Sequence, residues 1–307
     1  MQALVTGGAG FIGSHLVDAL LARGDTVRVF DDLSTGRREN VHAESELVEG
    51  SVVDEDAVRR AVAGCEVVFH QSALGAVARS VADPRTSDRV NVHGTLTVLT
   101  LARDAGVRRV VFASSSSVYG GAAVVPTPET VPTRPRSPYA VSKLAGEWYT
   151  RVFAELYDVE TVALRYFNVF GPRQRPDSTY AAVIPLFTAA LLADERPTVH
   201  GDGTQSRDFT YVSDVVAANL LAAGGPPETS SEVFNVAPGA GSSLLDLLAG
   251  LGRVIGVEPD PVFVEPRAGD IHTSCADASK ARTQLGWAPE VTFEDGLARY
   301  VDWLRSG

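Results

Sequence analysis

Apolar and polar positions alternate along the first half of the chain in a pattern typical of a parallel α/β sheet. Amphipathic segments with helical periodicity lie at roughly 11–23, 54–63, 88–105 and 137–157. Short apolar runs that end at a polar or glycine residue separate them, at 3–6, 27–30, 67–70, 110–114 and 161–165. Strands that alternate with helices form βαβ units with right-handed crossovers. We therefore expect an α/β fold with a doubly wound parallel sheet.

The pattern changes after about residue 170, where glycine and proline pairs separate shorter elements. Helices are predicted at 183–193, 213–223, 243–255 and 293–304, and short strands near 198 and 233. We expect a sheet domain over 1–170 and a smaller α/β C-terminal lobe over 171–307, with an interleaved boundary. The lobe would close over the ends of the strands in the first domain.

Composition and charge limit the kinds of partner that the chain can bind. The 307 residues carry a net charge of −11, and the sequence pI is near 5.0. Such a surface repels nucleic acid and anionic lipid, so we expect neither as a partner. The start of the chain lacks a signal-peptide pattern, Pro185 interrupts the longest apolar stretch, and no cysteine or histidine spacing indicates a metal. These features predict a cytoplasmic protein without a metal site.

The residues that follow the first predicted strand indicate a dinucleotide site. Gly7, Gly10 and Gly13 lie between that strand and the first helix. Glycines there permit a tight turn and let the backbone approach a pyrophosphate at the helix N-terminus. Asp31 ends the second predicted strand, where a carboxylate accepts hydrogen bonds from ribose hydroxyls and repels a 2′-phosphate. The sequence therefore predicts NAD rather than NADP, although Arg37 and Arg38 lie nearby.

A second group of residues suggests proton transfer. Only Lys143 and Lys280 are lysines among the 27 basic residues. Tyr139 and Lys143 are four residues apart on a predicted helix and so share one face. An ammonium beside a phenol favours the phenolate, which predicts a lowered pKa for Tyr139. Ser115 follows a buried strand at the edge where open α/β sheets bind ligands, and the three side chains together would deprotonate a sugar hydroxyl.

These motifs resemble the extended short-chain dehydrogenases/reductases, in particular the NAD-dependent epimerase/dehydratase group. The resemblance rests on 6–13, 114–120, 139–143, 165–173 and 207–209. It implies a Rossmann domain that binds NAD and a lobe that binds a nucleoside diphosphate sugar. The cofactor contacts that it implies, together with the glycines above, are Phe11, Ile12, Asp31, Asp32, Ser34, Gly36, Val52, Gln71, Asn91, Lys143 and Phe167. Ser51 departs from the pattern, because the family usually has an aspartate there that reaches the adenine amino group.

Within this group, the residues beside Ser115 favour 4-epimerisation. Ser116 and Ser117 provide no carboxyl group for an elimination, whereas dehydratases of the group place an acid there. The resemblance thus implies a UDP-hexose 4-epimerase that works through a 4-keto sugar without net oxidation. A UDP-glucuronate 4-epimerase, a nucleotide-sugar dehydratase or reductase, and a non-catalytic NAD sensor remain alternatives. The segment 172–177 also resembles UDP-glucuronate epimerases.

The resemblance further implies a substrate pocket with small walls. A small residue at Ser274, where epimerases restricted to glucose and galactose tend to have tyrosine, leaves space for a 2-acetamido group. UDP-N-acetylglucosamine is therefore an expected substrate beside UDP-glucose. The implied substrate contacts are Gly75, Ala76, Ser115, Asn168, Ala182, Val183, Val199, His200, Arg207, Arg267, Asp270 and Ser274. Two copies of the chain would form a homodimer through a four-helix bundle of the helices at 137–157 and 88–105.

Overall fold

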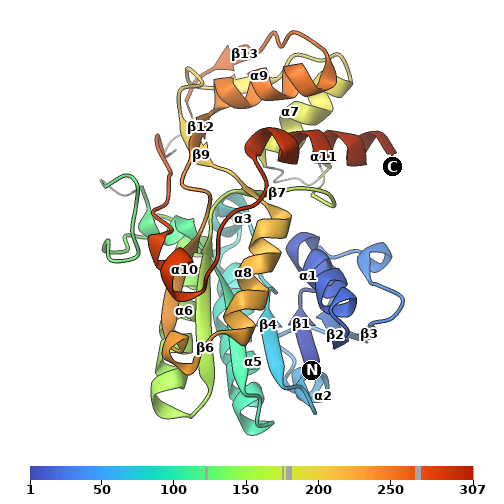
Figure 1. The fold of residues 1–307 in the computed structure, drawn as a ribbon, viewed down its shortest axis with the longest axis vertical. Helices are drawn as coiled ribbons and strands as arrows, with labels where there is room; N and C mark the ends of the chain where they lie inside the picture. The colour runs from blue at the N-terminus through green and yellow to red at the C-terminus, as the bar shows by residue number, and fades with distance from the viewer. Residues whose placement is uncertain (122–123, 175, 178–181, 267–270, 307) are drawn as a thin grey trace.

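The central feature of the computed structural model is a seven-stranded parallel sheet in the order β11-β6-β5-β4-β1-β2-β3 (Figure 1). The structure describes residues 1–121, 124–174, 176–177, 182–266 and 271–306. The strand order reverses between β1 and β4, which is the point where doubly wound sheets bind ligands. This arrangement confirms the predicted fold class. The strands are β1 Gln2–Thr6, β2 Thr26–Asp31, β3 Glu46–Glu49, β4 Val67–His70, β5 Arg109–Ser115, β6 Glu160–Tyr166 and β11 Glu232–Val236.

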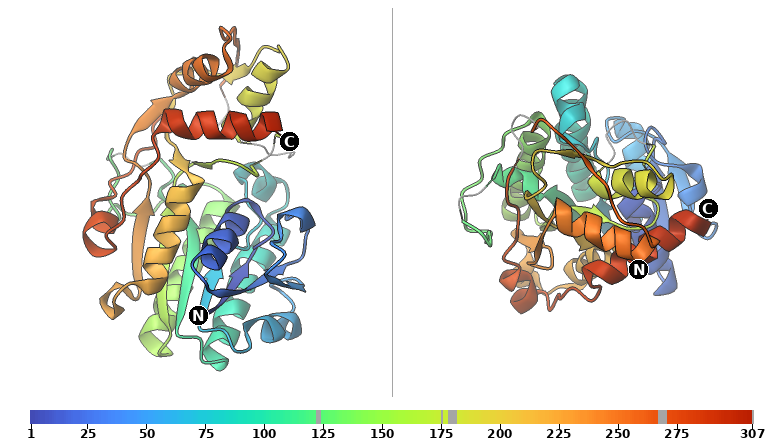
Figure 2. Two further views of the ribbon diagram at one scale, coloured as in Figure 1. Left: turned by 45° about the vertical axis from the view of Figure 1, so that its right-hand side comes forward. Right: turned by 90° about the horizontal axis from the view of Figure 1, so that it is seen from above.

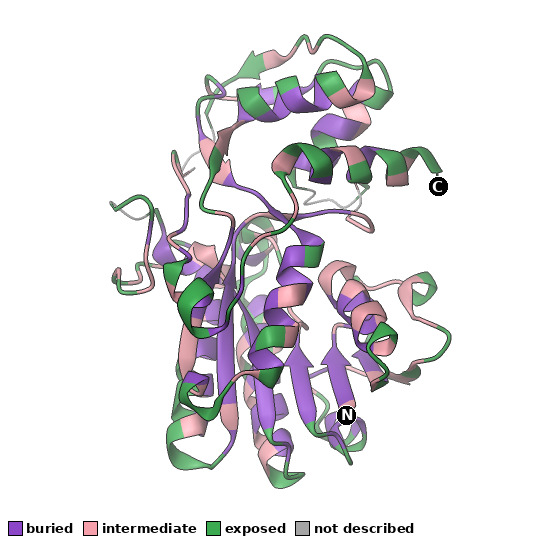
Figure 3. Ribbon diagram, in the orientation of Figure 1, coloured by how far each residue is buried: buried purple, intermediate pink, exposed green. Residues whose placement is uncertain are grey.

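Helices cover both faces of the sheet because successive side chains of each strand point to opposite sides. In β1, Ala3 and Val5 join a core with α1 and α8, whereas Leu4 joins a core with α2, α5 and α6. Figure 3 shows the strands as buried between exposed outer helix turns. The covering helices are α1 Phe11–Ala22, α2 Glu55–Val62, α5 Gly94–Asp104, α6 Pro138–Leu156 and α8 Val212–Gly224.

A smaller lobe lies at the end toward which the sheet strands point (Figures 1 and 2). Its own apolar core includes Phe187, Leu247 and Tyr300, one from each of three helices. Those helices are α7 Val183–Leu192, α9 Leu244–Ile255 and α11 Phe293–Ser306. Paired short strands complete the lobe and its junction with the sheet: β7 Val169–Phe170 with β10 Thr210–Tyr211, β8 Thr198–His200 with β13 Val262–Val264, and β9 Ser206–Asp208 with β12 Gly241–Ser243.

The chain crosses between the sheet and the lobe more than once. After β10 it returns to the sheet, where α8 packs on the face that α1 covers and β11 pairs with β6. A boundary at residue 170 therefore separates the sheet domain from the lobe only approximately, because residues 212–236 return to the sheet. The division into 1–170 and 171–307 stays a prediction.

Several short elements escaped the sequence pattern. β3 is an edge strand with glutamate at both ends, so it lacks the apolar run by which the other strands were found. The single helix expected over 88–105 is α4 Pro84–Asp88, a π-helical turn at Arg89–His93, and then α5. The helices α3 Val77–Ala82 and α10 Ser279–Gln284 were also not predicted, because neither is long enough to show a periodic apolar face.

None of the helices in the described ranges is long and apolar enough to cross a membrane. Within the same ranges, no three His, Cys, Asp or Glu side chains gather in a way that could hold a metal ion. His70 illustrates a structural histidine: its ring nitrogens lie 2.7 Å from Thr6 Oγ1 and 3.0 Å from Thr95 Oγ1. Burial lowers the pKa of His70 to about 3, so the ring is neutral at physiological pH and links β4 to its neighbours.

Candidate active site

The turn between β1 and α1 has the geometry of a phosphate-binding loop. Gly7 has a φ of +69°, and a Cβ added there would lie 2.8 Å from the Ser72 amide nitrogen. A Cβ on Gly13 would lie 2.1 Å from the Gly7 carbonyl oxygen. Only glycine fits either position, because backbone occupies the space that a side chain needs. The first amides of α1 therefore face open space at the helix N-terminus, where an anion is favoured.

Asp31 ends β2 and holds the loop that follows it. Its carboxylate accepts hydrogen bonds from the amides of Ala9 at 3.0 Å and Leu33 at 2.9 Å. A Cβ on Gly36 would lie 2.7 Å from Asp31 Oδ1, so glycine lets this loop fold closely over the carboxylate. Burial raises the pKa of Asp31, and the two backbone hydrogen bonds oppose this change. The carboxylate is thus held rigidly at the edge of the cavity described next.

Arg37 and Arg38, whose charges would favour a 2′-phosphate, form ion pairs with acidic side chains instead. Arg37 pairs with Asp177 at 2.9 Å and with Glu39 at 3.3 Å. Arg38 pairs with Glu49 at the end of β3. Neither arginine is among the described residues that line the cavity. The loop therefore presents the acidic side chains of Asp31 and Asp32, in agreement with the prediction of NAD rather than NADP.

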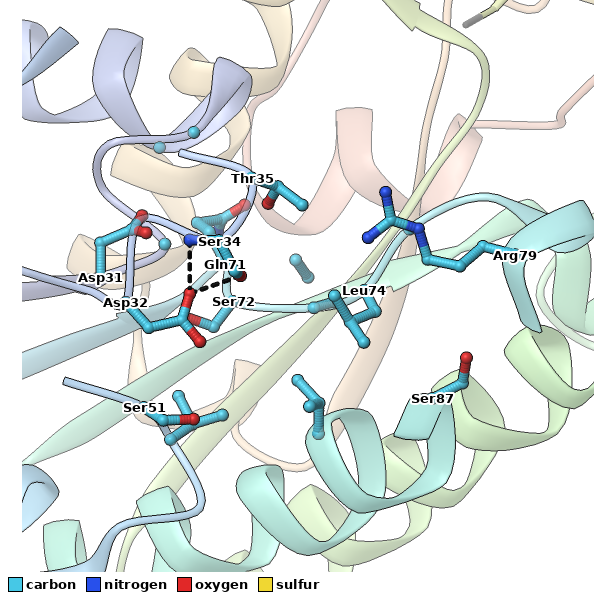
Figure 4. Close-up of a pocket in the computed structure, with 18 of the residues that line it drawn as sticks. Asp31, Asp32, Ser34, Thr35, Ser51, Gln71, Ser72, Leu74, Arg79 and Ser87 are labelled. Atoms are coloured by element: carbon cyan, nitrogen blue, oxygen red, sulfur yellow. Dashed lines mark hydrogen bonds between the residues drawn. The ribbon is translucent and has the colours of Figure 1, made fainter. Parts of the chain in front are cut away.

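A cavity of about 670 Å³ extends from the glycine turn to Tyr139 and Lys143 on α6, and Figure 4 shows part of its lining. Asp31, Asp32 and Ser34 lie at one side of it, and Arg79 and Ser87 lie at the other. The Asp32 carboxylate fixes the loop by accepting hydrogen bonds from Ser34 N at 3.0 Å and Ser34 Oγ at 2.5 Å. The predicted site residues that line this cavity are Gly7, Gly10, Phe11, Ile12, Gly13, Asp31, Asp32, Ser34, Val52, Gln71, Gly75, Tyr139 and Lys143.

The three residues expected to transfer a proton meet at the carboxyl end of β5. Ser137 caps α6 by accepting a hydrogen bond from Ala140 N, and this start of the helix directs Tyr139 and Lys143 toward the cavity. Lys143 Nζ donates a 2.7 Å hydrogen bond to the Ala113 carbonyl oxygen and lies 5.9 Å from the centre of the Tyr139 ring. Ser115 is the last residue of β5, and its hydroxyl accepts hydrogen bonds from Ser117 N and Ser117 Oγ.

The sequence predicted a lowered pKa for Tyr139, and this prediction is wrong for the structure described here. Burial raises the pKa of Tyr139, and hydrogen bonding with the Ser115 side chain opposes this change. Lys143 Nζ lies near the Tyr139 ring, 5.9 Å from its centre, and donates its hydrogen bond to the Ala113 carbonyl oxygen. Burial also lowers the pKa of Lys143, to about 8, against the opposing charge of Glu147. The spacing correctly placed both residues on one face but did not show the burial that they share.

Three predicted cofactor contacts lie behind the cavity wall. Asn91 is buried and joins Leu74 to α6, with its Oδ1 accepting from Leu74 N at 2.7 Å and its Nδ2 donating to Ser142 Oγ at 3.1 Å. Phe167 is buried against Tyr119, and Gly36 lies against Asp31. These residues shape the wall in the structure. Their direct contact with a cofactor stays a prediction.

The sequence did not identify much of the wall opposite Asp31. Ser72, Ala73 and Leu74 follow β4 directly, so the rule that ligands bind at strand ends could have found them. Arg79 and Ser87 come from α3 and α4, which no pattern indicated. The remaining lining residues that were not predicted as contacts are Thr35, Gly50, Ser51, Val53, Asp83, Thr86, Arg89, Val90, Ala113, Ser114 and Tyr166.

The predicted substrate contacts form a second group near the lobe. Arg207 on β9 donates from Nη1 to the carbonyl oxygens of Ser206 and Ile271, at 2.8 and 2.6 Å. Ser274 lies beside β9, and its backbone amide donates a 3.1 Å hydrogen bond to Ser206 O. Asn168 has a φ of +33° and donates to Asp208 O at 3.3 Å. Arg207 therefore lies on β9, and Asn168 and Ser274 each form a hydrogen bond to the backbone of that strand.

The other predicted substrate residues are more dispersed. Ala76 has a φ of +73° and precedes α3, while Ala182 and Val183 begin α7. Val199 is buried in β8, and His200 Nδ1 lies 3.2 Å from Glu265 O. Arg267 and Asp270 fall outside the described residues. Apart from Gly75, no predicted sugar or nucleotide contact lines the described part of the 670 Å³ cavity, so their joint role stays a prediction.

The cavity fits a dinucleotide on two independent observations. The Gly7 and Gly13 positions admit no side chain, which leaves the helix N-terminus accessible to a pyrophosphate. Ser87 lines the same cavity, and its buried Oγ has no hydrogen-bond partner among the residues that the structure describes. A buried hydroxyl without a partner costs stability, so a polar group bound in the cavity would satisfy it. The lining residues would hold NAD between Asp31 and Lys143.

Comparisons with known proteins agree with this reading. The family described as the NAD dependent epimerase/dehydratase family matches residues 3–237. The chain is 43% identical to a UDP-glucose 4-epimerase of Mycolicibacterium smegmatis, over 100% of this chain and 99% of that protein.

Two solved structures share the whole fold. The crystal structure of the Thermotoga maritima UDP-glucose 4-epimerase with UDP-glucose has a TM-score of 0.96 and 40% identity, and covers 100% of this chain and 99% of that one. The UDP-N-acetylglucosamine 4-epimerase of Methanobrevibacter ruminantium, in complex with UDP-N-acetylmuramic acid, has a TM-score of 0.95 and 38% identity, and covers 99% and 98%. The chain therefore belongs to the NAD-dependent epimerase/dehydratase family.

Proposed function

We propose that the protein is a UDP-hexose 4-epimerase that interconverts UDP-glucose and UDP-galactose and also accepts UDP-N-acetylhexosamines. The observation that carries this proposal is the convergence of Ser115, Tyr139 and Lys143 at the end of β5, beside a cavity that fits NAD. Ser116 and Ser117, which follow Ser115, offer no carboxyl group for eliminating water. Relatives of 35–43% identity over 95–100% of the chain are named UDP-glucose 4-epimerases, and this name supports the same activity here.

In the proposed reaction the protein removes and returns one proton at the sugar 4-hydroxyl. Tyr139, as phenolate, takes this proton, and the Ser115 hydroxyl hydrogen-bonds the same sugar oxygen. Lys143 supplies positive charge at the phenol, held in place by the Ala113 carbonyl. NAD⁺ held by the cavity residues would accept the hydride from carbon 4, would return it after the sugar has turned, and would add a positive charge that favours the phenolate. When the 4-keto sugar has turned, Tyr139 gives the proton back to the oxygen at carbon 4, so the proton that it took is restored and the reaction needs no net acid or base.

The lobe would hold the nucleoside diphosphate. Arg207 lies beside Ser274 with one end of its guanidinium fixed by the carbonyls of Ser206 and Ile271. A guanidinium fixed in this way is suited to bidentate binding of phosphate oxygens. We assign Arg207 to the diphosphate. We assign Asn168, which donates a hydrogen bond to Asp208 at the end of β9, to the sugar or a phosphate.

The size of the side chain at Ser274 should decide whether a 2-acetamido sugar fits. We expect Ser274→Tyr to keep turnover of UDP-glucose but to lower kcat/KM for UDP-N-acetylglucosamine by at least about tenfold, because the added ring fills the space of the acetamido group. Thr273→Ser, a small change at the neighbouring position, is the matched control. Steady-state kinetics with both sugars measure the ratio. Equal losses for the two substrates would contradict the assignment of Ser274 to the sugar pocket.

The function itself is tested by incubating the purified protein with UDP-glucose and following the products by proton NMR and mass spectrometry. An epimerase yields UDP-galactose of unchanged mass until equilibrium is reached from either side. A dehydratase yields a 4-keto-6-deoxy sugar that has lost one water. Absence of UDP-galactose while NAD is bound would overturn the proposal. A parallel reaction with UDP-N-acetylglucosamine tests the wider substrate range.

We also propose a homodimer that uses α6. Val141, Trp148, Val152 and Leu156 are exposed on this helix at spacings of seven, four and four residues, which places them along one side. Val77 and Val81 are exposed on the neighbouring α3, whereas the predicted partner segment 88–105 has no large exposed apolar side chain. Light scattering should give twice the monomer mass, and Trp148→Glu should shift it toward monomer. A monomeric wild-type protein at assay concentrations would contradict the proposal.

A further inference from the structure

Three residues of α6 occupy one face at a spacing of four: Tyr139, Lys143 and Glu147. Lys143 and Glu147 are both buried, and each binds β5. Lys143 Nζ donates to the Ala113 carbonyl oxygen, and the Ser114 hydroxyl donates a short hydrogen bond to Glu147 Oε1. The helix therefore holds two consecutive residues of β5, and the next residue of that strand is Ser115.

Glu147 is itself fixed by the neighbouring strand. Arg165 on β6 binds both of its carboxylate oxygens, with Nε to Oε1 at 2.8 Å and Nη2 to Oε2 at 2.7 Å. Arg165 Nη1 donates a hydrogen bond to Tyr119 OH at 2.7 Å, and that hydroxyl donates to Asn235 Oδ1 at 2.8 Å. The carboxylate thus connects α6 and β5 to β6, β11 and the turn that follows Ser115.

Stability alone does not account for this arrangement. Two buried charges lose their hydration, and an apolar pair of similar volume is often equally stable or more stable. A fixed carboxylate can instead hold nearby groups in a single geometry. Glu147 lies one helical turn from Lys143 and binds Ser114, the residue before Ser115. The proposed reaction requires a single geometry of these groups.

We propose that Glu147, held by Arg165, is a positioning residue that fixes Lys143 and Ser115 relative to Tyr139. The inference rests on the proposed 4-epimerase function. Glu147 is not among the described residues that line the cavity, so its effect passes through its hydrogen bond to Ser114 on β5 and through its charge near Lys143.

The charge of Glu147 has a definite direction of effect. The groups around Lys143 are Tyr139 and Glu147 on α6, the Phe112 ring and Ala113 carbonyl on β5, and His70 on β4, with Arg165 on β6 behind Glu147. His70 has a pKa of about 3 and is neutral near pH 7. Burial lowers the pKa of Lys143 to about 8, and the Glu147 charge raises it. Removing that charge lowers the pKa further, so Lys143 loses its proton at lower pH.

The experiment compares kcat and KM for UDP-glucose against pH in the wild type, Glu147→Gln and Glu155→Gln. Glu155 lies on the same helix but is exposed and pairs with Arg151, so its variant is the matched control. We expect Glu147→Gln to lower kcat at least about tenfold with little change in KM, and to move the alkaline limb of the kcat profile about one pH unit lower. Glu155→Gln should match the wild type, and Glu147→Asp should restore the limb by restoring the charge.

A buried Arg165 without its partner can prevent folding. The double variant Glu147→Gln/Arg165→Met removes both charges, and its thermal unfolding shows whether the fold is retained. It should fold and still show the reduced kcat and the shifted limb. Folded variants with the wild-type kcat and pH profile would overturn this inference alone. A wild-type protein that does not convert UDP-glucose would overturn the proposed function and this inference with it.

Discussion

Replacing Tyr139 by phenylalanine should lower kcat for UDP-glucose by about 10²–10⁴-fold while NAD stays bound. The change removes the hydroxyl to which the account assigns the proton of the sugar, and a positioned acid–base group contributes about this much. The ring, its burial and the neighbouring Lys143 stay in place, so the cavity keeps its shape. A coupled assay of UDP-galactose formation measures kcat, and NAD released on denaturation measures the bound cofactor.

Tyr157→Phe provides the matched control for this prediction. Tyr157 follows the last turn of α6, packs against Phe153 and lies outside the described cavity lining. Loss of its hydroxyl should leave kcat and cofactor content unchanged. Turnover by Tyr139→Phe close to that of the wild type would remove Tyr139 from the reaction. Loss of NAD together with turnover would show that its role is structural.

Substituting alanine for Gly13 should weaken NAD binding and lower the activity with it. The new Cβ would lie 2.1 Å from the Gly7 carbonyl oxygen, a distance at which backbone must move. That movement would displace the turn from which the first amides of α1 meet the pyrophosphate. Overpacking of this kind costs about 1–3 kcal/mol, so we expect NAD affinity to fall at least about tenfold. Calorimetric titration of the cofactor-free protein with NAD measures the change.

Gly24→Ala separates this effect from a general loss of stability. Gly24 follows α1 with a φ of +86°, but no other atom lies within 4 Å of its added Cβ. The left-handed conformation costs about 1–2 kcal/mol for alanine, without any displacement of the glycine turn. Its affinity for NAD should therefore equal that of the wild type. Unchanged NAD affinity in Gly13→Ala would contradict the placement of the cofactor at this turn.

The sequence was informative wherever a local pattern decides the structure. The alternation of apolar runs with helical periodicity predicted β1, β2, β4, β5 and β6, because each is a buried strand with helices on both faces. The glycine spacing and Asp31 predicted one half of the cavity, since a tight turn and a terminal carboxylate have recognisable residues. The i, i+4 spacing likewise predicted that Tyr139 and Lys143 share a face.

Properties that depend on distant parts of the chain were not accessible in the same way. The burial that raises the pKa of Tyr139 comes from packing around α6, which spacing does not encode. Arg79 and Ser87 reach the cavity from short helices without a periodic face. The position of Glu147 between Ser114 and Arg165 joins residues of three elements. The homodimer, the cytoplasmic location and the contacts of the substrate lobe stay predictions.

The central claim is that the reaction takes hydrogen from carbon 4 of the sugar and returns the same hydrogen without exchange with water. UDP-glucose labelled with deuterium at carbon 4 tests it directly, in ordinary water with no added cofactor. We predict UDP-galactose that retains the deuterium at carbon 4 completely, as read by NMR and mass spectrometry. UDP-galactose that has lost the label to solvent, or formation that requires added NAD in stoichiometric amounts, would contradict the account.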